Sequence, residues 1–275
     1  MVTTAKTEKV DAEDSITVVT SLLAAVEVQE DTQYSFIDTP GKLSSVIDAI
    51  QDLPTSPPSL FVDLEGENLC RDGTISILQL HVSSIGLTYL IDVHTLTDTT
   101  FTTPSKNGTT FKHILESSSI PKVFFDIRND SDALYSHYKI ELHGVQDLQL
   151  MELATRRFPG RFINGLAKCI ERDLILSWRE REAWKATKEQ GVRLFAPERG
   201  GSYKVFCERP LSEAIKLYCV QDVKFLPRLW SYYNTSLTAQ KREKVRLASV
   251  ERVRESHSVG YQPHGRQKAL IPKGW

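Results

Sequence analysis

Two carboxylates, Asp63 and Glu65, lie two residues apart in the segment 59–66, which otherwise has the apolar composition of a buried β-strand. Because side chains on a strand alternate between its faces, both acids are expected on one face, with Val62 and Leu64 on the core side. Paired like charges repel, and each costs roughly several kcal/mol if it is buried without a partner. Divalent cations with oxygen ligands relieve such repulsion. The pattern therefore indicates a metal site, the alternative being an edge strand with both acids in water.

Two further groups of residues have types and spacings that suit the same chemistry. Tyr218 and Asp222 are four positions apart in a segment with helical periodicity, which places a phenol one turn from a carboxylate. An ordinary surface hydrogen bond is the alternative for this pair. Asp130 falls in the first turn of another predicted helix, just beyond a short apolar strand. Asp126 and Asp132 stay open as alternatives to Asp130, because each could equally be a helix cap.

Alternating strands and helices would position these residues. The patterns predict strands over 34–38, 59–66, 74–81, 87–93 and 122–125, with a turn at 71–73. They predict helices over 41–53, 110–117, 126–139, 163–172, 177–189, 211–233 with a break before Pro227, and 237–257. Thr39 followed by Pro40 is typical of a helix start. The order of elements indicates a mixed sheet flanked by helices.

Composition and charge bound the function classes. The 275 residues are 40% hydrophobic and 25% charged, with a formal net charge of -1, which is typical of a globular protein. The charge is uneven, since residues 156–209 contain thirteen Lys and Arg against seven Asp and Glu, and residues 237–275 nine against three. Such surfaces could bind a phosphate backbone, or could be solvated helix faces. We expect an N-terminal extension over 1–33, one domain over 34–235, and a basic helix with an irregular tail over 236–275.

The cysteines and the N-terminus indicate the cellular environment. Cys70, Cys169, Cys207 and Cys219 are widely spaced, which argues against a zinc site or a disulfide scaffold and fits a reducing compartment. The N-terminal segment is acidic where a targeting presequence would be basic. No apolar run approaches the roughly 20 residues of a membrane span. We expect a soluble intracellular protein, nuclear or cytoplasmic, with no membrane partner.

In this order, Asp63-Leu64-Glu65, an aspartate at a helix start and Tyr218-x-x-x-Asp222 resemble the three motifs of the DEDD superfamily of 3′–5′ exonucleases, in its tyrosine-containing, ribonuclease D-like group. Over roughly residues 34–235 the chain more closely resembles the Egalitarian-like branch, through DLEGENLCRDGTISILQL, DIRNDSDALYSHYKI and ERPL. It also resembles an uncharacterised fungal set of 3′–5′ exonuclease-domain proteins, through the KVFFDIRNDSDAL block and the PHGR tail. Within this resemblance, counting back from the end of the helix selects Asp130. The resemblance implies an α/β fold of the ribonuclease H-like type, a mixed β-sheet flanked by α-helices, with a helical C-terminal extension. It also implies a structural role for Asp147.

The resemblance further implies hydrolysis of RNA or single-stranded DNA from the 3′ end, with release of nucleoside 5′-monophosphates and two Mg²⁺ or Mn²⁺ ions as cofactors. Asp63 would bridge both ions, Glu65 and Asp222 would hold one, and Asp130 would reach the other through water. Tyr218 would orient the attacking water, because a phenol with a pKa near 10 is a weak base at neutral pH. Some relatives have lost acids and act as adaptors that bind RNA or protein. This sequence keeps all four acids and the tyrosine, which favours an enzyme.

The basic region supplies candidates for binding a single strand, since such strands are held by cationic grooves and aromatic stacking. Arg193, Arg199 and Tyr203 are the expected substrate-binding residues. Trp178 and Trp184 are further candidates, although packing within a helical layer is the more frequent role of such tryptophans.

Overall fold

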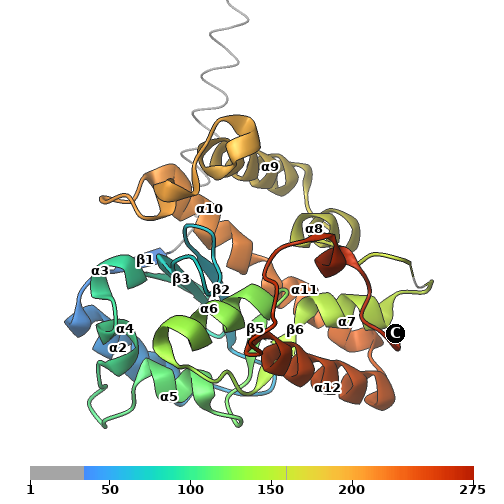
Figure 1. Ribbon diagram of the computed structural model, residues 1–275, viewed down its shortest axis with the longest axis horizontal. Coiled ribbons are helices and arrows are strands. Elements are labelled where there is room, and N and C mark those ends of the chain that lie inside the picture. Colours follow the sequence, from blue (N-terminus) through green and yellow to red (C-terminus); the bar gives the residue numbers. More distant parts are fainter. Residues whose placement is uncertain (1–33, 159) are drawn as a thin grey trace, which may run out of the picture.

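The structure, a computed structural model, describes residues 34–158 and 160–275, and the predicted extension over 1–33 lies outside them. Its centre is a six-stranded sheet in the order β1-β4-β3-β2-β5-β6 (Figure 1). The strands are β1 (Tyr34–Ile37), β2 (Leu60–Glu65), β3 (Ile77–Val82), β4 (Leu87–Ile91), β5 (Lys122–Phe124) and β6 (Val145–Asp147). The pairs β2–β3 and β3–β4 are antiparallel, while β1–β4, β2–β5 and β5–β6 are parallel. The sheet is therefore mixed, as the sequence predicts.

Helices surround the sheet, and each predicted helix is present with its ends moved by a few residues. They are α2 (Pro40–Ile50), α3 (Val93–Leu96), α4 (Thr99–Thr102), α5 (Phe111–Glu116), α6 (Arg128–Tyr138), α7 (Leu148–Thr155), α8 (Leu166–Asp173), α9 (Trp178–Phe195), α10 (Glu213–Lys224), α11 (Leu226–Ser236) and α12 (Ala239–Ser256). Short 3₁₀ turns are η1 (Pro197–Arg199), η2 (Tyr203–Phe206) and η3 (Arg266–Ala269). The Thr39 side chain accepts a hydrogen bond from Lys42 N, which confirms the predicted start of α2.

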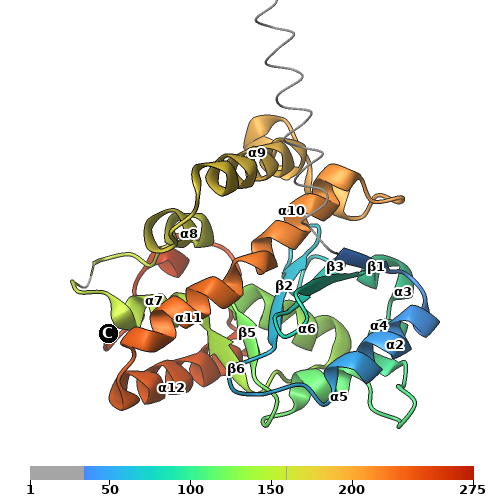
Figure 2. The same cartoon turned by 180° about the vertical axis from the view of Figure 1, so that it is seen from behind.

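Strand β2 contributes to both faces of the sheet because its side chains alternate. Val62 and Leu64 pack with α2, α5 and α6 in one core, which confirms the expected core side of this strand. Phe61, on the opposite face, packs against α7, α8 and α11. Asp63 and Glu65 share the face of Phe61, and α10 covers this face further along the sheet (Figure 2).

The two residues before α6 are held at the end of β6 by Asp147. The Asp147 carboxylate accepts hydrogen bonds from the backbone N–H groups of Asp126 and Ile127, both at 3.2 Å. It also pairs with Arg252 of α12 at 2.7 Å, where both side chains are almost fully buried. These contacts confirm the expected structural role of Asp147 and pack α12 against β6 and α6.

The segment after α12 is more ordered than the sequence indicates. The sequence predicts that residues 258–275 lack regular structure, yet they contain η3 and an isolated β-bridge between Leu270 and Phe162. The Arg71 guanidinium donates to the Ser258 carbonyl at 2.9 Å, and the Arg128 guanidinium donates to the Lys268 carbonyl at 3.0 Å. These long-range contacts leave no local pattern in the sequence, which is why the expectation was only partly right.

Within the part of the chain that the structure describes, no helix combines the length and the apolar composition that crossing a membrane requires.

Candidate functional site

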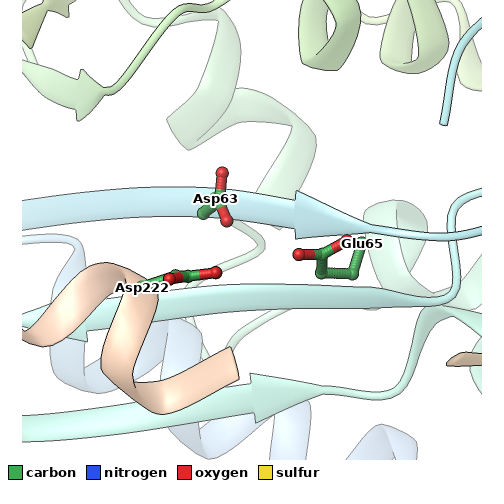
Figure 3. Close-up of side chains that lie close together, drawn as sticks. All are labelled: Asp63, Glu65 and Asp222. Atoms are coloured by element: carbon green, nitrogen blue, oxygen red, sulfur yellow. The ribbon is translucent and has the colours of Figure 1, made fainter. Parts of the chain in front are cut away.

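Three carboxylates from two elements meet on the face of the sheet that α10 covers. Asp63 and Glu65 project from β2 and Asp222 projects from α10 (Figure 3). One oxygen atom of each lies within 4.8 Å of one oxygen of the other two. A set of ligands made only of carboxylate oxygens suits hard divalent cations such as Mg²⁺ and Mn²⁺. Three of the four expected metal ligands are thus brought together, and their chemistry fits the expected ions.

The three acids lie close together against their mutual repulsion. Burial raises the pKa of Asp63 well above its usual range, and the nearby charges of Asp130, Glu65 and Asp222 raise it further. Burial, followed by the charge of Asp222, has the same effect on the pKa of Glu65. Burial also raises the pKa of Asp222, although the Lys188 ammonium and a hydrogen bond from Tyr218 oppose that rise. A bound cation would remove most of this repulsion.

Asp130 lies beside this group, not within it. It belongs to the first turn of α6, and its side chain is buried. Burial, and next the charge of Asp126, raises the pKa of Asp130 to about 7. Among the described residues its Oδ1 atom has no hydrogen-bond partner. The charge of Asp130 in turn raises the pKa values of Asp63 and Glu65, as expected for a carboxylate that borders the same space. Asp130 therefore offers an unpartnered buried oxygen beside the three acids.

The two alternatives to Asp130 already have charged partners. Asp126 pairs with the Arg128 guanidinium at 2.5 Å, and Arg128 and Arg252 hold its pKa below the usual range despite burial. The fully buried Asp132 pairs with the Arg71 guanidinium at 2.7 Å. Both carboxylates therefore stabilise the fold, which leaves Asp130 as the member of this trio that is available to a metal ion.

Tyr218 lies one helical turn before Asp222 on α10, and its side chain is almost fully buried. The phenol donates a hydrogen bond to the Asp222 carboxylate. Burial, and next the charges of Asp222 and Glu65, raises the pKa of Tyr218 far above its usual value. The phenol is consequently a neutral hydrogen-bond donor at physiological pH.

The start of α10 is fixed to the sheet. Arg209, which precedes the helix, pairs with the buried Asp92 at the end of β4, with Nε at 2.8 Å from Oδ2. Ser212 is the N-cap of α10, and its hydroxyl accepts a hydrogen bond from Ile215 N. The ion pair with Asp92 therefore fixes the start of the helix that carries Tyr218 and Asp222 relative to the sheet.

Among the expected substrate-binding residues, Tyr203 is linked to the site through aromatic contacts. Its ring stacks on Phe195 with ring centres 5.8 Å apart, and Phe195 in turn packs edge-on against Tyr218 at 5.0 Å. Burial raises the pKa of Tyr203, as do the nearby charges of Glu198 and Glu65. Tyr203 thus joins an aromatic cluster that borders the three carboxylates.

The other candidates from the basic region lie further out or are buried. Arg193 is exposed on α9 and pairs with Glu189 at 2.6 Å, and Arg199 is exposed at the end of η1. Trp184 is buried, as expected for core packing, whereas 79% of the Trp178 surface is exposed, so that expectation is wrong for Trp178. The contacts given for Arg193 and Arg199 do not link either arginine directly to the three carboxylates.

Two residues of α9 near the site were not identified from the sequence. The Lys188 ammonium lowers the pKa values of Glu65 and Asp222, and Gly191 lies against the Tyr218 ring. Both belong to one helix face, because they are three positions apart. Nothing in the sequence marks which part of the fold that face meets, so no local signal could have found them.

Comparisons with known proteins identify a family and a fold for this chain. The model of a family described as 3′-5′ exonuclease matches residues 34–237. No curated protein matches the chain. Many solved structures are similar to it, among them the following three. Trypanosoma brucei RNase D in complex with RNA U12 is 20% identical, with 89% of this chain and 78% of that chain covered and a TM-score of 0.67. Escherichia coli RNase D is 20% identical, with 81% and 51% covered and a TM-score of 0.53. Brucella melitensis NrnC with bound Mg²⁺ is 18% identical, with 82% and 90% covered and a TM-score of 0.51. These likenesses confirm the ribonuclease H-like α/β fold.

Proposed function

Because the chain belongs to the 3′–5′ exonuclease family whose model its residues 34–237 match, we propose that it hydrolyses RNA or single-stranded DNA from the 3′ end with two divalent cations, Mg²⁺ or Mn²⁺. Each cycle would release one nucleoside 5′-monophosphate. Asp63, Glu65 and Asp222 are the proposed direct ligands, and Asp130 completes the set, through water or directly. Since this is a family of nucleases, the substrate is a nucleic acid.

The observation that carries the proposal is the convergence of Asp63, Glu65 and Asp222 within 4.8 Å on the covered face of the sheet. A fold gains no stability from three adjacent carboxylates whose pKa values are raised by burial and by one another. Clusters of acids with strongly perturbed pKa values occur preferentially at functional sites. When bound, the cations would activate a water molecule and stabilise charge on the leaving oxygen.

Tyr218 would contribute orientation, not proton abstraction. Its raised pKa keeps the phenol protonated, and burial, the largest cause, does not depend on the state of the acids. A buried neutral hydroxyl that already donates to Asp222 can accept a hydrogen bond from the attacking water and hold its lone pair toward phosphorus. This role supports placing the chain in the tyrosine-containing, ribonuclease D-like group. Within that group we propose that the chain belongs to the Egalitarian-like branch.

Substrate binding is proposed for Tyr203, Arg193 and Arg199. Tyr203 borders the acids and belongs to an aromatic cluster on which a terminal base could stack. The exposed arginines of α9 and η1 would attract the phosphates further along the strand. Single-stranded RNA is the first substrate to test, since a similar RNase D was solved with RNA.

The test is digestion of a 5′-labelled single-stranded RNA, and of the DNA with the same sequence, in Mg²⁺, Mn²⁺ or EDTA. The proposal expects a ladder that shortens from the 3′ end, requires a divalent cation and disappears in EDTA. Immediate release of the 5′ label as a mononucleotide, which indicates attack from the 5′ end, or cleavage that persists in EDTA, contradicts it. Retained RNA binding in a gel shift without any cleavage would instead favour a catalytically idle adaptor.

A further inference from the structure

One face of α9 packs against the part of α10 that carries Tyr218. Trp184, Lys188, Gly191 and Phe195 follow one another at intervals of four, three and four residues, so they lie along a single helix face. Phe195 contacts the Tyr218 ring edge-on, and a Cβ atom on Gly191 would lie 2.4 Å from Tyr218 Cδ2. Trp184 is buried and Gly191 is buried. Lys188 is thus the charged member of an otherwise apolar face that meets the site.

Lys188 is held near the acids without being neutralised by them. Its side chain is half-buried, and its Nζ lies 6.0 Å from the centre of the Trp184 ring. Lys188 lies one turn before Gly191 on the helix face that contacts Tyr218, and its positive charge lowers the pKa values of Glu65 and Asp222. Across residues 34–158 and 160–275, however, it forms no ion pair, whereas Lys185 on the exposed side of α9 pairs with Glu182 at 3.7 Å.

We propose that Lys188 is a further catalytic residue, whose ammonium group donates a hydrogen bond to a non-bridging oxygen of the scissile phosphate. The proposal rests on the proposed exonuclease function. A lysine is a compact cation with three donors on a flexible stem, so it can reach a phosphate placed between α9 and the carboxylates. With cations bound to the acids, a substrate phosphate held by those cations would be an anionic partner for Lys188.

The chemistry gives such a cation a specific task. During hydrolysis a water oxygen bonds to phosphorus and the bond from phosphorus to the 3′ oxygen of the preceding nucleotide breaks. The proton released by the water passes through solvent, and the leaving oxygen takes up a proton, so that one water molecule is consumed. Lys188 remains an ammonium throughout. Preorganised donors directed at phosphoryl oxygens stabilise the transition state more than the ground state.

The variants Lys188→Met and Lys188→Arg test the proposal, with Lys185→Met as the matched control. Single-turnover cleavage of a labelled single-stranded RNA is measured over a range of protein concentrations in Mn²⁺. Lys188→Met should lower the rate constant at saturation by about 100-fold and change the half-saturating concentration by less than about 3-fold. Lys188→Arg should have a rate constant at saturation at least about 10-fold higher than that of Lys188→Met, because arginine keeps the positive charge. Lys185→Met should match the parent protein.

Binding of Mn²⁺, followed by its electron paramagnetic resonance signal, distinguishes this role from a structural one. Removing a cation beside carboxylates strengthens their attraction for Mn²⁺, so Lys188→Met should bind Mn²⁺ at least as tightly as the parent. Three results for Lys188→Met would each overturn the proposal: an unchanged rate constant at saturation, a change only in the half-saturating protein concentration, or a loss of Mn²⁺ binding. If the parent protein itself shows no metal-dependent cleavage, the proposed function fails, and this inference fails with it.

Discussion

The ring of Tyr218 occupies the space that a side chain at position 191 would need. A Cβ atom on Gly191 would lie 2.4 Å from Tyr218 Cδ2 and 2.6 Å from Cγ, distances that real Cβ atoms do not adopt. The glycine therefore allows α9 to approach α10 closely enough to fix the ring beside Asp222. By contrast, nothing lies within 4 Å of the equivalent position on Gly41, near the start of α2.

Gly191→Ala should slow hydrolysis by displacing the Tyr218 hydroxyl. Tyr218→Phe should also slow it, by about 10- to 100-fold, with little change in RNA affinity. If Gly191 acts through that hydroxyl, adding Gly191→Ala to Tyr218→Phe should lower the rate constant no further. Single-turnover rates of the two single variants and the double variant complete this cycle.

Gly41→Ala is the control for a glycine-to-alanine change in a helix, and it should leave the rate unchanged. Additive losses in the double variant would show that Gly191 has a general packing role unrelated to the phenol. Wild-type rates in both single variants would remove Tyr218 from the mechanism.

The stability of the metal-free protein should depend on pH through Asp130. Burial raises its pKa to about 7 in the folded state, above the ordinary value of an aspartate. A group whose pKa is raised by folding contributes stability at low pH that is lost as the pH rises through its folded pKa. Asp130→Asn, which stays neutral, should therefore melt at a higher temperature than the parent at pH 8, and by a smaller margin at pH 5, which lies between the ordinary pKa of an aspartate and the raised pKa of Asp130.

Thermal melting in EDTA measures this difference directly, and comparing the two proteins at each pH cancels the titration of other groups. Mn²⁺ should raise the melting temperature of the parent more at pH 8 than at pH 5, because protons compete for the same oxygens. If the difference in melting temperature between the two proteins does not grow with pH, folding does not raise the pKa of Asp130.

Arg252 should stabilise the fold far more than its neighbour Arg254, although both belong to α12. Arg252 is buried and pairs with the fully buried Asp147, so Arg252→Ala leaves a buried charge without its partner. Such losses cost about 3 kcal/mol or more. The exposed Arg254 pairs with Glu251 in solvent, and Arg254→Ala should leave stability unchanged. Equal urea-unfolding midpoints for the two variants would show that α12 is not part of the cooperative unit.

Local rules account for the part of the site that lies on regular elements. Strand alternation places Asp63 and Glu65 on one face, and the four-residue spacing places Tyr218 one turn from Asp222. The identity of these residue types, and their resemblance to exonuclease motifs, then suffices to indicate a metal-dependent nuclease. The sheet and the helices follow from the same periodicities.

Tertiary contacts decide what the local rules leave open. Helical spacing alone does not distinguish Asp126, Asp130 and Asp132. The family resemblance selects Asp130, and the ion pairs with Arg128 and Arg71 show why Asp126 and Asp132 are not available. Lys188 and Gly191 reach the site because α9 folds back onto α10, which no short pattern records. The same reason explains the ordered segment after α12, whose backbone is held by arginines distant in sequence.

The central claim is that Asp63, with its neighbouring acids, holds the metal ions that drive cleavage from the 3′ end. The most direct test compares the parent protein, Asp63→Asn and the exposed control Asp52→Asn on one 5′-labelled single-stranded RNA in Mn²⁺. The account predicts a 3′-shortening ladder with the parent and with Asp52→Asn. It predicts a loss of at least about 100-fold with Asp63→Asn, whose melting temperature without metal should be equal or higher because one repulsive charge is gone. Cleavage by Asp63→Asn at the parent rate would contradict the assignment of the site.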